Sequence, residues 1–154
     1  MSSNFQRKNS SSNAAEGKAF EKEVKYFFYD NYGIELEENH KVILGISSAK
    51  FKTCDLGIKD EIIIECKSHS WTETDNIPSA KLTTWNEAMY FFHLAPYHKR
   101  KLFIVEKFLS KKREKTLAEY YVSINHHLIP EDVEIWEFDV KERLMNQINT
   151  KYRT

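Results

Sequence analysis

Asp55, Glu65 and Lys67 belong to the segment CDLGIKDEIIIECKS, whose pattern predicts a β-hairpin. Side chains alternate between the faces of a strand, so the strands expected over 51–58 and 61–67 each carry an apolar face. The register that brings those faces together places Asp55 directly opposite Glu65, with Lys67 alongside. Like charges opposed on a sheet are destabilising, and such a conflict between local rules points to a functional site.

The length of the turn between the two strands decides which residues of the hairpin face each other. A two-residue turn would avoid the acid pair, but it would mix Leu56 with Glu65 on one face. In the preferred register the Cys66 side chain points to the core, where a free cysteine behaves as a small hydrophobic residue. The predicted pairs are Ile58 with Ile62, Leu56 with Ile64, Cys54 with Cys66, Asp55 with Glu65, and Thr53 with Lys67.

A divalent cation would resolve the conflict between the two acids. Carboxylate oxygens are ligands of Mg²⁺, and a neighbouring lysine suits phosphate chemistry, where it holds a water or an anionic oxygen. The alternative is a solvent-facing strand surface with an incidental Lys–Glu pair. The triplet Asp/Glu-x-Lys occurs four times in the chain, but only the copy at Glu65 ends an apolar strand and has an acid on the preceding strand.

An acid on one strand followed by Glu-x-Lys at the end of the next resembles the PD-(D/E)XK nuclease superfamily, which includes many restriction endonucleases and the archaeal Holliday junction resolvases. Asp55 matches the strand aspartate of that superfamily, with Cys54 where its proline would stand, and Glu65 and Lys67 match Glu-x-Lys. The segment GKAFEKEV resembles the resolvase helix whose first glutamate joins the active site, here Glu21.

The resemblance covers roughly residues 16–108 and implies a metal-dependent endonuclease with a restriction endonuclease-like core. Its Mg²⁺, for which Mn²⁺ would substitute, is expected on Asp55 and Glu65, with the Cys66 backbone carbonyl and Glu21 completing the site. Lys67 would orient the nucleophile or stabilise charge on the phosphate. Glu16 and Glu21 flank the apolar stripe of the helix on opposite sides; the resemblance favours Glu21, and Glu16 is the fallback.

The order of the helices and strands that must position these residues predicts an α/β fold, with a central mixed five-stranded sheet flanked by helices. Residues 1–13 are Ser/Asn-rich and are expected to be a flexible segment before a single domain over 14–154. A polar helix is expected to close the chain. The other expected elements are a helix over 14–33, strands over 40–46, 51–58, 61–67, 101–108 and 133–140, and helices that begin near 79 and 114.

The composition narrows the class of protein. The chain has 154 residues and equal numbers of basic and acidic residues, 23 each, so no global positive field marks a sequence-blind nucleic-acid binder. No apolar run is long enough to span a membrane, and no secretory signal is visible. The two cysteines form neither a disulfide framework nor a zinc pattern, which favours a cytoplasmic protein.

Several residues are expected to contact nucleic acid, most simply DNA. Cutting both strands without a separate recognition domain favours a homodimer. A catalytically silent binding member of the same fold and an RNA-cleaving toxin or defence nuclease stay open as alternatives. The candidate contacts are Lys81 near a helix start, Trp71 as a base-stacking or packing residue, and two basic clusters, Lys99, Arg100 and Lys101, and Lys111, Lys112 and Arg113.

Overall fold

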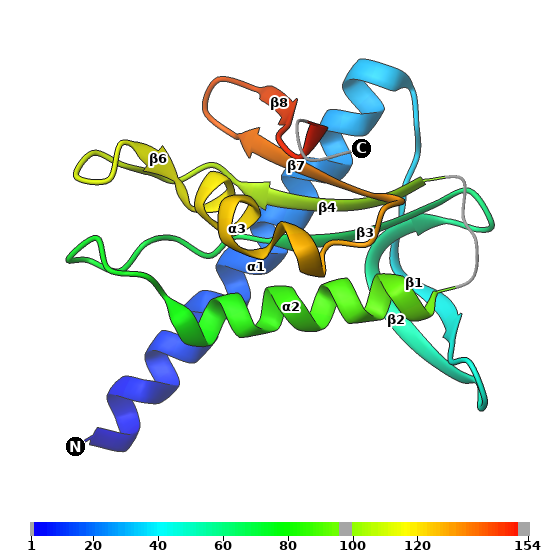
Figure 1. Ribbon diagram of the computed structural model, residues 1–154, viewed down its shortest axis with the longest axis horizontal. Helices are drawn as coiled ribbons and strands as arrows, with labels where there is room; N and C mark the ends of the chain where they lie inside the picture. The colour runs from blue at the N-terminus through cyan, green and yellow to red at the C-terminus, as the bar shows by residue number, and fades with distance from the viewer. Residues whose placement is uncertain (1, 96–99, 151–154) are drawn as a thin grey trace.

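Six strands form one mixed sheet in the computed structural model of the chain, which describes residues 2–95 and 100–150, with side chains from residue 13 onward (Figure 1). The strand order is β1-β2-β3-β4-β7-β8, with β3, β4 and β7 parallel and the other pairs antiparallel. The strands are β1 (Glu37–Leu44), β2 (Lys50–Ile58), β3 (Ile62–Lys67), β4 (Arg100–Glu106), β7 (Val133–Asp139) and β8 (Leu144–Gln147).

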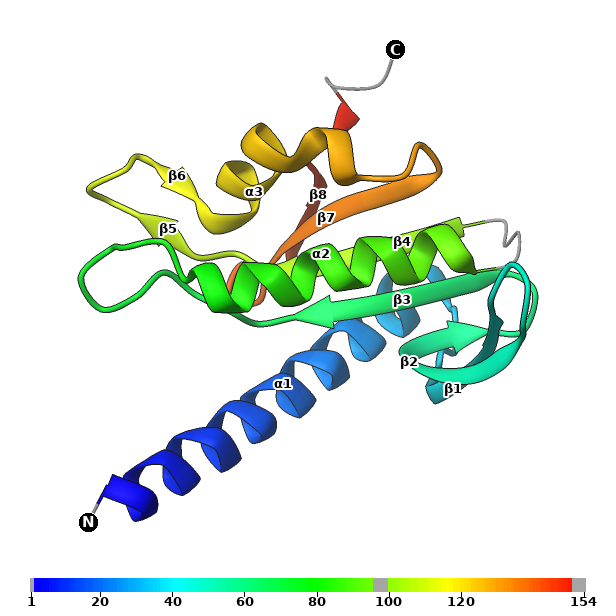
Figure 2. The same cartoon turned by 60° about the horizontal axis from the view of Figure 1, so that its bottom comes forward.

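Helices cover both faces of this sheet (Figure 2). Helix α1 (Ser2–Tyr32) packs on one face, and α2 (Ser79–Leu94) and α3 (Leu117–Asn125) pack on the other. A short 3₁₀-helix, His126–Leu128, follows α3. The α/β class with a helix-flanked mixed sheet is therefore confirmed. Parallel strands need a crossover connection, and α2 makes that connection between β3 and β4.

The face beneath α1 is closed by aromatic and aliphatic side chains. Phe20, Val24, Phe27 and Phe28 are buried, as the helical spacing predicts, and they pack against the β3 and β4 residues of that face. The helix ends before Gly33, whose φ of 64° lies in the left-handed region that favours glycine. The helix begins at Ser2 rather than near residue 14, and the flexibility of residues 1–13 stays a prediction.

The face beneath α2 and α3 has a second core. Trp85 and Phe92 of α2 and Tyr121 of α3 are among the fully buried side chains, together with Phe103 of β4. The rings of Trp85 and Phe103 meet edge to face with centroids 5.5 Å apart, and those of Trp85 and Tyr121 at 5.1 Å. This core fixes the position of α2 relative to the end of β3.

Two expectations for the C-terminal half are wrong. The expected polar tail helix is instead strand β8, which pairs antiparallel with β7 and makes the sheet six-stranded rather than five-stranded. Its half-exposed side chains lack the strong apolar alternation that identifies a strand, so pairing with β7 decides its conformation. The segment expected as one helix from 114 begins instead with β6 (Lys115–Thr116), which pairs with β5 (Leu109–Ser110).

Among the described residues, no helix combines the length and the apolar character that crossing a membrane requires.

Candidate active site

The pairing of β2 with β3 confirms the predicted register only where the two strands are hydrogen-bonded. Leu56 lies opposite Ile64 and Ile58 opposite Ile62, as expected, but the paired stretch stops there. The backbone N–H of Cys66 donates to Oδ2 of Asp55 over 2.8 Å. The Asp55 carboxylate therefore binds the β3 backbone beyond the paired stretch instead of lying in a regular cross-strand pair with Glu65.

The prediction that Cys54 and Leu56 share a face is wrong. Cys54 packs in the core under α2, whereas Leu56 packs in the core under α1. Asn39 of β1 stands opposite Asp55, between two regular pairs, and its φ of 53° lies in the left-handed region. Asparagine tolerates that conformation. The alternation of β2 is thus interrupted at Asp55, opposite a residue with this unusual conformation.

Glu21 of α1 reaches this point from one face of the sheet. Its side chain is buried, and burial followed by the charge of Asp55 raises its pKa. An ion pair with Lys18, with Nζ 3.0 Å from Oε2, opposes that rise. Glu16, the other candidate for the helix acid, is exposed and lines a cleft of about 500 Å³ that includes Glu106. The structure thus brings Glu21, and not Glu16, to Asp55.

Glu65 approaches from the other face. It lies beside Phe103 of the parallel strand β4, and Phe103 belongs to the core under α2. The side chain is only 8 % exposed, and its Oε1 has no hydrogen-bond partner. Burial, followed by the charge of Asp55, raises the pKa of Glu65 to about 8, against the opposing effect of Lys52 and Lys67. In the absence of a cation, Glu65 therefore keeps its proton at neutral pH.

The side chains gathered here carry the kind of ligand atom, carboxylate oxygen, that Mg²⁺ prefers. Mg²⁺ is commonly bound by one or two carboxylates together with several waters, so Asp55 and Glu65 suffice as protein ligands. The partnerless buried oxygen of Glu65 is a donor that protein contacts leave unused. Within residues 2–95 and 100–150, no three His, Cys, Asp or Glu side chains already form a metal-binding group. Glu21 and Glu65 approach Asp55 from opposite faces.

Lys67 ends β3, and its charge acts on Glu65. Lys52, which sequence reasoning missed, acts on Glu65 as well and more strongly; its Nζ lies 4.3 Å from the centroid of the Phe91 ring. Lys52 lies on β2 two residues before Cys54, so alternation from the buried Cys54 is the only signal that would have found it.

His69 is a second residue that sequence reasoning missed. Trp85 Nε1 donates to its Nδ1 over 2.9 Å, and the two rings stack with centroids 6.3 Å apart. Burial, followed by the charges of Lys67 and Lys81, lowers its pKa to about 4. The position of His69 two residues after Lys67 is the available sequence signal, because alternate residues of an extended chain lie on the same side.

Trp71 does not present its ring for base stacking. It is 7 % exposed, and its Nε1 donates to the Phe108 carbonyl over 3.0 Å. Tyr120 meets the ring edge to face at 5.6 Å, and the Arg113 guanidinium lies 5.2 Å from it. Of the two readings left open for Trp71, packing is the one that the structure supports.

The structure separates the two basic clusters that the sequence places around β4. Because β3 and β4 are parallel and Arg100 pairs with Ile62, this cluster lies at the beginning of both strands, about 16 Å from the end of β3. Arg100 contacts Glu134 through two hydrogen bonds of 3.1 and 3.2 Å. Neither Arg100 nor Lys101 is brought to the site, and Lys99 lies outside the described residues.

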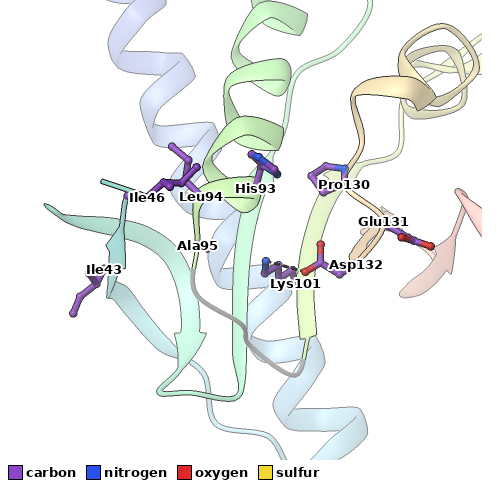
Figure 3. Close-up of a pocket in the computed structure, with 10 residues that line it drawn as sticks. Ile43, Ile46, His93, Leu94, Ala95, Lys101, Pro130, Glu131 and Asp132 are labelled. Atoms are coloured by element: carbon purple, nitrogen blue, oxygen red, sulfur yellow. Dashed lines mark ion pairs between the residues drawn. The ribbon is translucent and has the colours of Figure 1, made fainter. Parts of the chain in front are cut away.

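Lys101 has a structural role that its surroundings make plain. It is 4 % exposed, and its Nζ donates to the Phe92 carbonyl at 3.0 Å and pairs with Asp132 at 2.8 Å. Lys101 and Asp132 point toward each other in the wall of a cavity of about 890 Å³ that also includes His93 (Figure 3). This cavity lies at the beginning of β4, away from the acids at the end of β3.

The second basic cluster belongs to the turn between β5 and β6. Lys111 and Lys112 are exposed there. Arg113 is half-buried, and its Nε donates to the Asp75 carbonyl over 2.7 Å, which ties this turn to the loop that follows β3. Lys111 and Lys112 therefore remain available for solvent or a ligand on the side of the molecule where β3 ends.

No protein-family model matches the chain, and comparisons with curated proteins and with solved structures found no significant match.

Proposed function

We propose that the protein is a metal-dependent endonuclease that hydrolyses phosphodiester bonds, with DNA as its substrate. The observation that carries the proposal is the buried, partnerless oxygen of Glu65 next to Asp55 and Lys67. A buried acid without a partner is costly, and such groups cluster where a function requires them. A purely structural strand end has no need of this arrangement.

Asp55 and Glu65 would hold the Mg²⁺, with the Cys66 backbone carbonyl and Glu21 as further ligands. A bound Mg²⁺ lowers the pKa of a ligated water and offsets charge on the reacting phosphate. The Cys66 N–H fixes one oxygen of Asp55 and thereby orients the carboxylate. Lys67 would orient the nucleophile or stabilise negative charge on the phosphate. Mn²⁺ is expected to substitute for Mg²⁺.

The order of elements supports a restriction endonuclease-like core. The chain runs α1, β1, β2, β3, α2 and β4, the order that the resemblance to the PD-(D/E)XK superfamily implies. The acid, the Glu-x-Lys pair and the helix glutamate lie on the elements where that resemblance expects them. Membership of that superfamily is part of the proposal, and so is a cytoplasmic location, which suits the two free cysteines.

Exposed lysines favour a nucleic acid as the substrate. Lys81 of α2 and the pair Lys111 and Lys112 are exposed in the part of the molecule where β3 ends, and they are suited to phosphate contacts. The described part of the chain holds one such site, so cleavage of both strands would take a homodimer.

The test is a nuclease assay on plasmid and duplex DNA with Mg²⁺, with Mn²⁺ and with EDTA. We expect cleavage that requires the cation and that is lost in Glu65→Ala and Lys67→Ala, while Lys59→Ala, an exposed lysine in the turn before β3, cleaves like the wild type. Undiminished cleavage by the first two variants would refute the assignment. DNA binding without any cleavage would favour a silent binding protein, and cleavage of RNA alone would replace DNA as the substrate.

A further inference from the structure

The contact between His69 and Trp85 determines which nitrogen of the imidazole carries the proton. An indole N–H is only a donor, so Nδ1 of His69 accepts the 2.9 Å hydrogen bond from Trp85 Nε1. The imidazole is neutral at physiological pH, because its pKa is lowered to about 4. A neutral imidazole with an accepting Nδ1 has its proton on Nε2. His69 therefore presents a hydrogen-bond donor, and its basic nitrogen is occupied.

Trp85 holds this donor in a fixed orientation. The Trp85 side chain is 1 % exposed and is packed between Phe103 and Tyr121. The His69 ring lies nearly parallel to the indole, with an interplanar angle of 19°. A ring that is both stacked and hydrogen-bonded has little freedom to rotate, so the Nε2–H direction is set by the core under α2.

Two lysines surround His69. Lys67 precedes it by two residues at the end of β3, and Lys81 lies one helical turn before Trp85 on the same face of α2. These lysines are the charged groups that act on His69, and no carboxylate among the described residues offsets them there. Neither ammonium group has a hydrogen-bond or ion-pair partner within residues 13–95 and 100–150.

We propose that Lys67, His69 and Lys81 form a subsite for a backbone phosphate of the nucleic acid, in which His69 donates a hydrogen bond from Nε2 to a phosphate oxygen. Trp85 is a positioning residue for that donor. The subsite rests on the proposed function for the identity of its ligand, and it extends the site from the acids at Asp55 and Glu65 toward the beginning of α2. Two cations and one neutral donor, with no carboxylate acting on His69, are suited to an oxyanion.

The carboxylates and this subsite have separate tasks in the proposal. Glu65 and Asp55 bind a cation, whereas the His69 subsite holds the chain of the substrate on the other side of Lys67. Lys67 belongs to both the cation site and the phosphate subsite. In this proposal it contacts a phosphate in addition to its effect on Glu65. Binding through the subsite needs no metal, so it can be measured while cleavage is blocked.

The test is fluorescence anisotropy of a labelled DNA duplex with the full chain in EDTA, where cleavage is absent. His69→Asn keeps an oxygen acceptor near the position of Nδ1 but removes the Nε2–H, whereas His69→Gln places an amide N–H near the position of Nε2. We expect His69→Asn to weaken binding about ten-fold, the usual loss of a hydrogen bond to a charged group, and His69→Gln to retain most of the affinity. The matched control, the exposed His127→Asn, should bind like the wild type.

Lys81→Ala supplies an independent measurement. We expect it to weaken binding and to reduce the slope of log affinity against log salt by about 1, because one phosphate contact is lost. Lys59→Ala, the exposed control lysine, should leave the slope unchanged. Equal affinity of His69→Asn and the wild type, or an equal loss in His69→Asn and His69→Gln, would overturn the subsite.

Nuclear magnetic resonance of the wild type tests the proposal without any variant, so its result does not depend on whether the variants fold. The ¹⁵N signals of His69 should report an Nε2–H tautomer, and the Nε2 signal should shift when the duplex is added in EDTA. A different tautomer or an unmoved signal at saturating duplex would overturn the proposal. These outcomes are independent of the nuclease assay: a subsite without cleavage would refute only the proposed function, and cleavage without these effects would refute only the subsite.

Discussion

Two buried ionisable residues on neighbouring parallel strands, Lys101 at the beginning of β4 and Glu65 near the end of β3, differ in how many of their polar atoms have partners. The Lys101 ammonium contacts a helix carbonyl and an aspartate at 3.0 and 2.8 Å. Glu65 has an oxygen without any partner and a pKa raised to about 8. The paired ammonium of Lys101 contributes to the fold at that end, whereas the partnerless oxygen of Glu65 is the feature on which the proposed metal site rests.

The cavity beside Lys101 and the acids with raised pKa values lie at different ends of the parallel strands. The cavity of about 890 Å³ adjoins Lys101, whose ammonium contacts the Phe92 carbonyl and Asp132. At the end of β3, Glu21 and Glu65 have raised pKa values, and Glu65 has a buried oxygen without a hydrogen-bond partner. The proposed site is therefore assigned from the state of its polar groups and not from this cavity.

Substitutions of Glu65 and Lys101 should differ most in their effect on the rate of DNA cleavage. Glu65→Gln should lower the rate of DNA cleavage by about a thousand-fold, because an amide cannot replace a carboxylate as a Mg²⁺ ligand. Lys101→Met should leave the rate near that of the wild type. Single-turnover cleavage of a labelled duplex measures both rates. Comparable losses in the two variants would mean that the two ends of the strands do not differ in function.

The next effect is on the pH dependence of stability. The folded chain keeps a proton on Glu65 up to about pH 8, whereas an ordinary glutamate loses it near 4.5, so the folded state binds more protons between these values. Stability must then fall as pH rises through that window in the absence of metal. Urea unfolding of the wild type from pH 4.5 to pH 8.5 should show a decline of a few kcal/mol.

Glu65→Gln removes this titration and should make the decline smaller, so that the variant is more stable than the wild type at pH 8. The exposed Glu87→Gln should retain the decline and serves as the matched control. A wild-type profile that is flat, or that rises over this range, would show that Glu65 is ionised in the folded protein.

A substitution of Lys101, at the beginning of β4, should reduce the stability of the fold and leave the cleavage rate unchanged. Lys101→Met removes the hydrogen bond to the Phe92 carbonyl and the ion pair with Asp132 while preserving much of the buried side-chain volume. We expect a loss of about 2 kcal/mol in the free energy of unfolding, measured in urea, since the Phe92 carbonyl then lacks this donor. A loss below about 0.5 kcal/mol would show that the lysine is not structural.

The smallest effect expected is stabilisation by the cation. Mg²⁺ at ten times its dissociation constant should raise the free energy of unfolding by about 1.4 kcal/mol through mass action. Binding must displace the proton from Glu65, so the affinity should increase as pH rises toward 8. Thermal unfolding with and without Mg²⁺ measures the shift, which should vanish in Glu65→Gln and persist in Lys101→Met.

The sequence predicted the parts of the candidate site that depend on local pattern. The apolar spacing of Phe20, Val24 and Phe27 identifies the helix that supplies Glu21. The alternation in β2 and β3 predicts the register observed at Leu56 and Ile64. The face shared by Cys54 and Leu56 was predicted wrongly, because the two side chains pack in different cores and alternation alone does not reveal the break between them.

The residues around the site that sequence reasoning missed or misplaced depend on contacts between distant segments. His69 acquires its tautomer from Trp85, which is 16 positions away, and Trp71 is enclosed by Tyr120 and Arg113. Strand β8 exists because β7 offers it an edge, not because its own pattern is strand-like. None of these properties has a local signature.

The sequence by itself determined that an acid within one strand and a Glu-x-Lys pair at the end of the next lie on adjacent strands, since apolar alternation sets strand faces and their pairing. Only the tertiary structure decided that Glu21, rather than Glu16, joins them, and that Lys101 is committed to structural contacts. It also left an oxygen of Glu65 buried without a partner. The physical reason is that burial and electrostatic partners are properties of packed elements, and packing sets the pKa of each group.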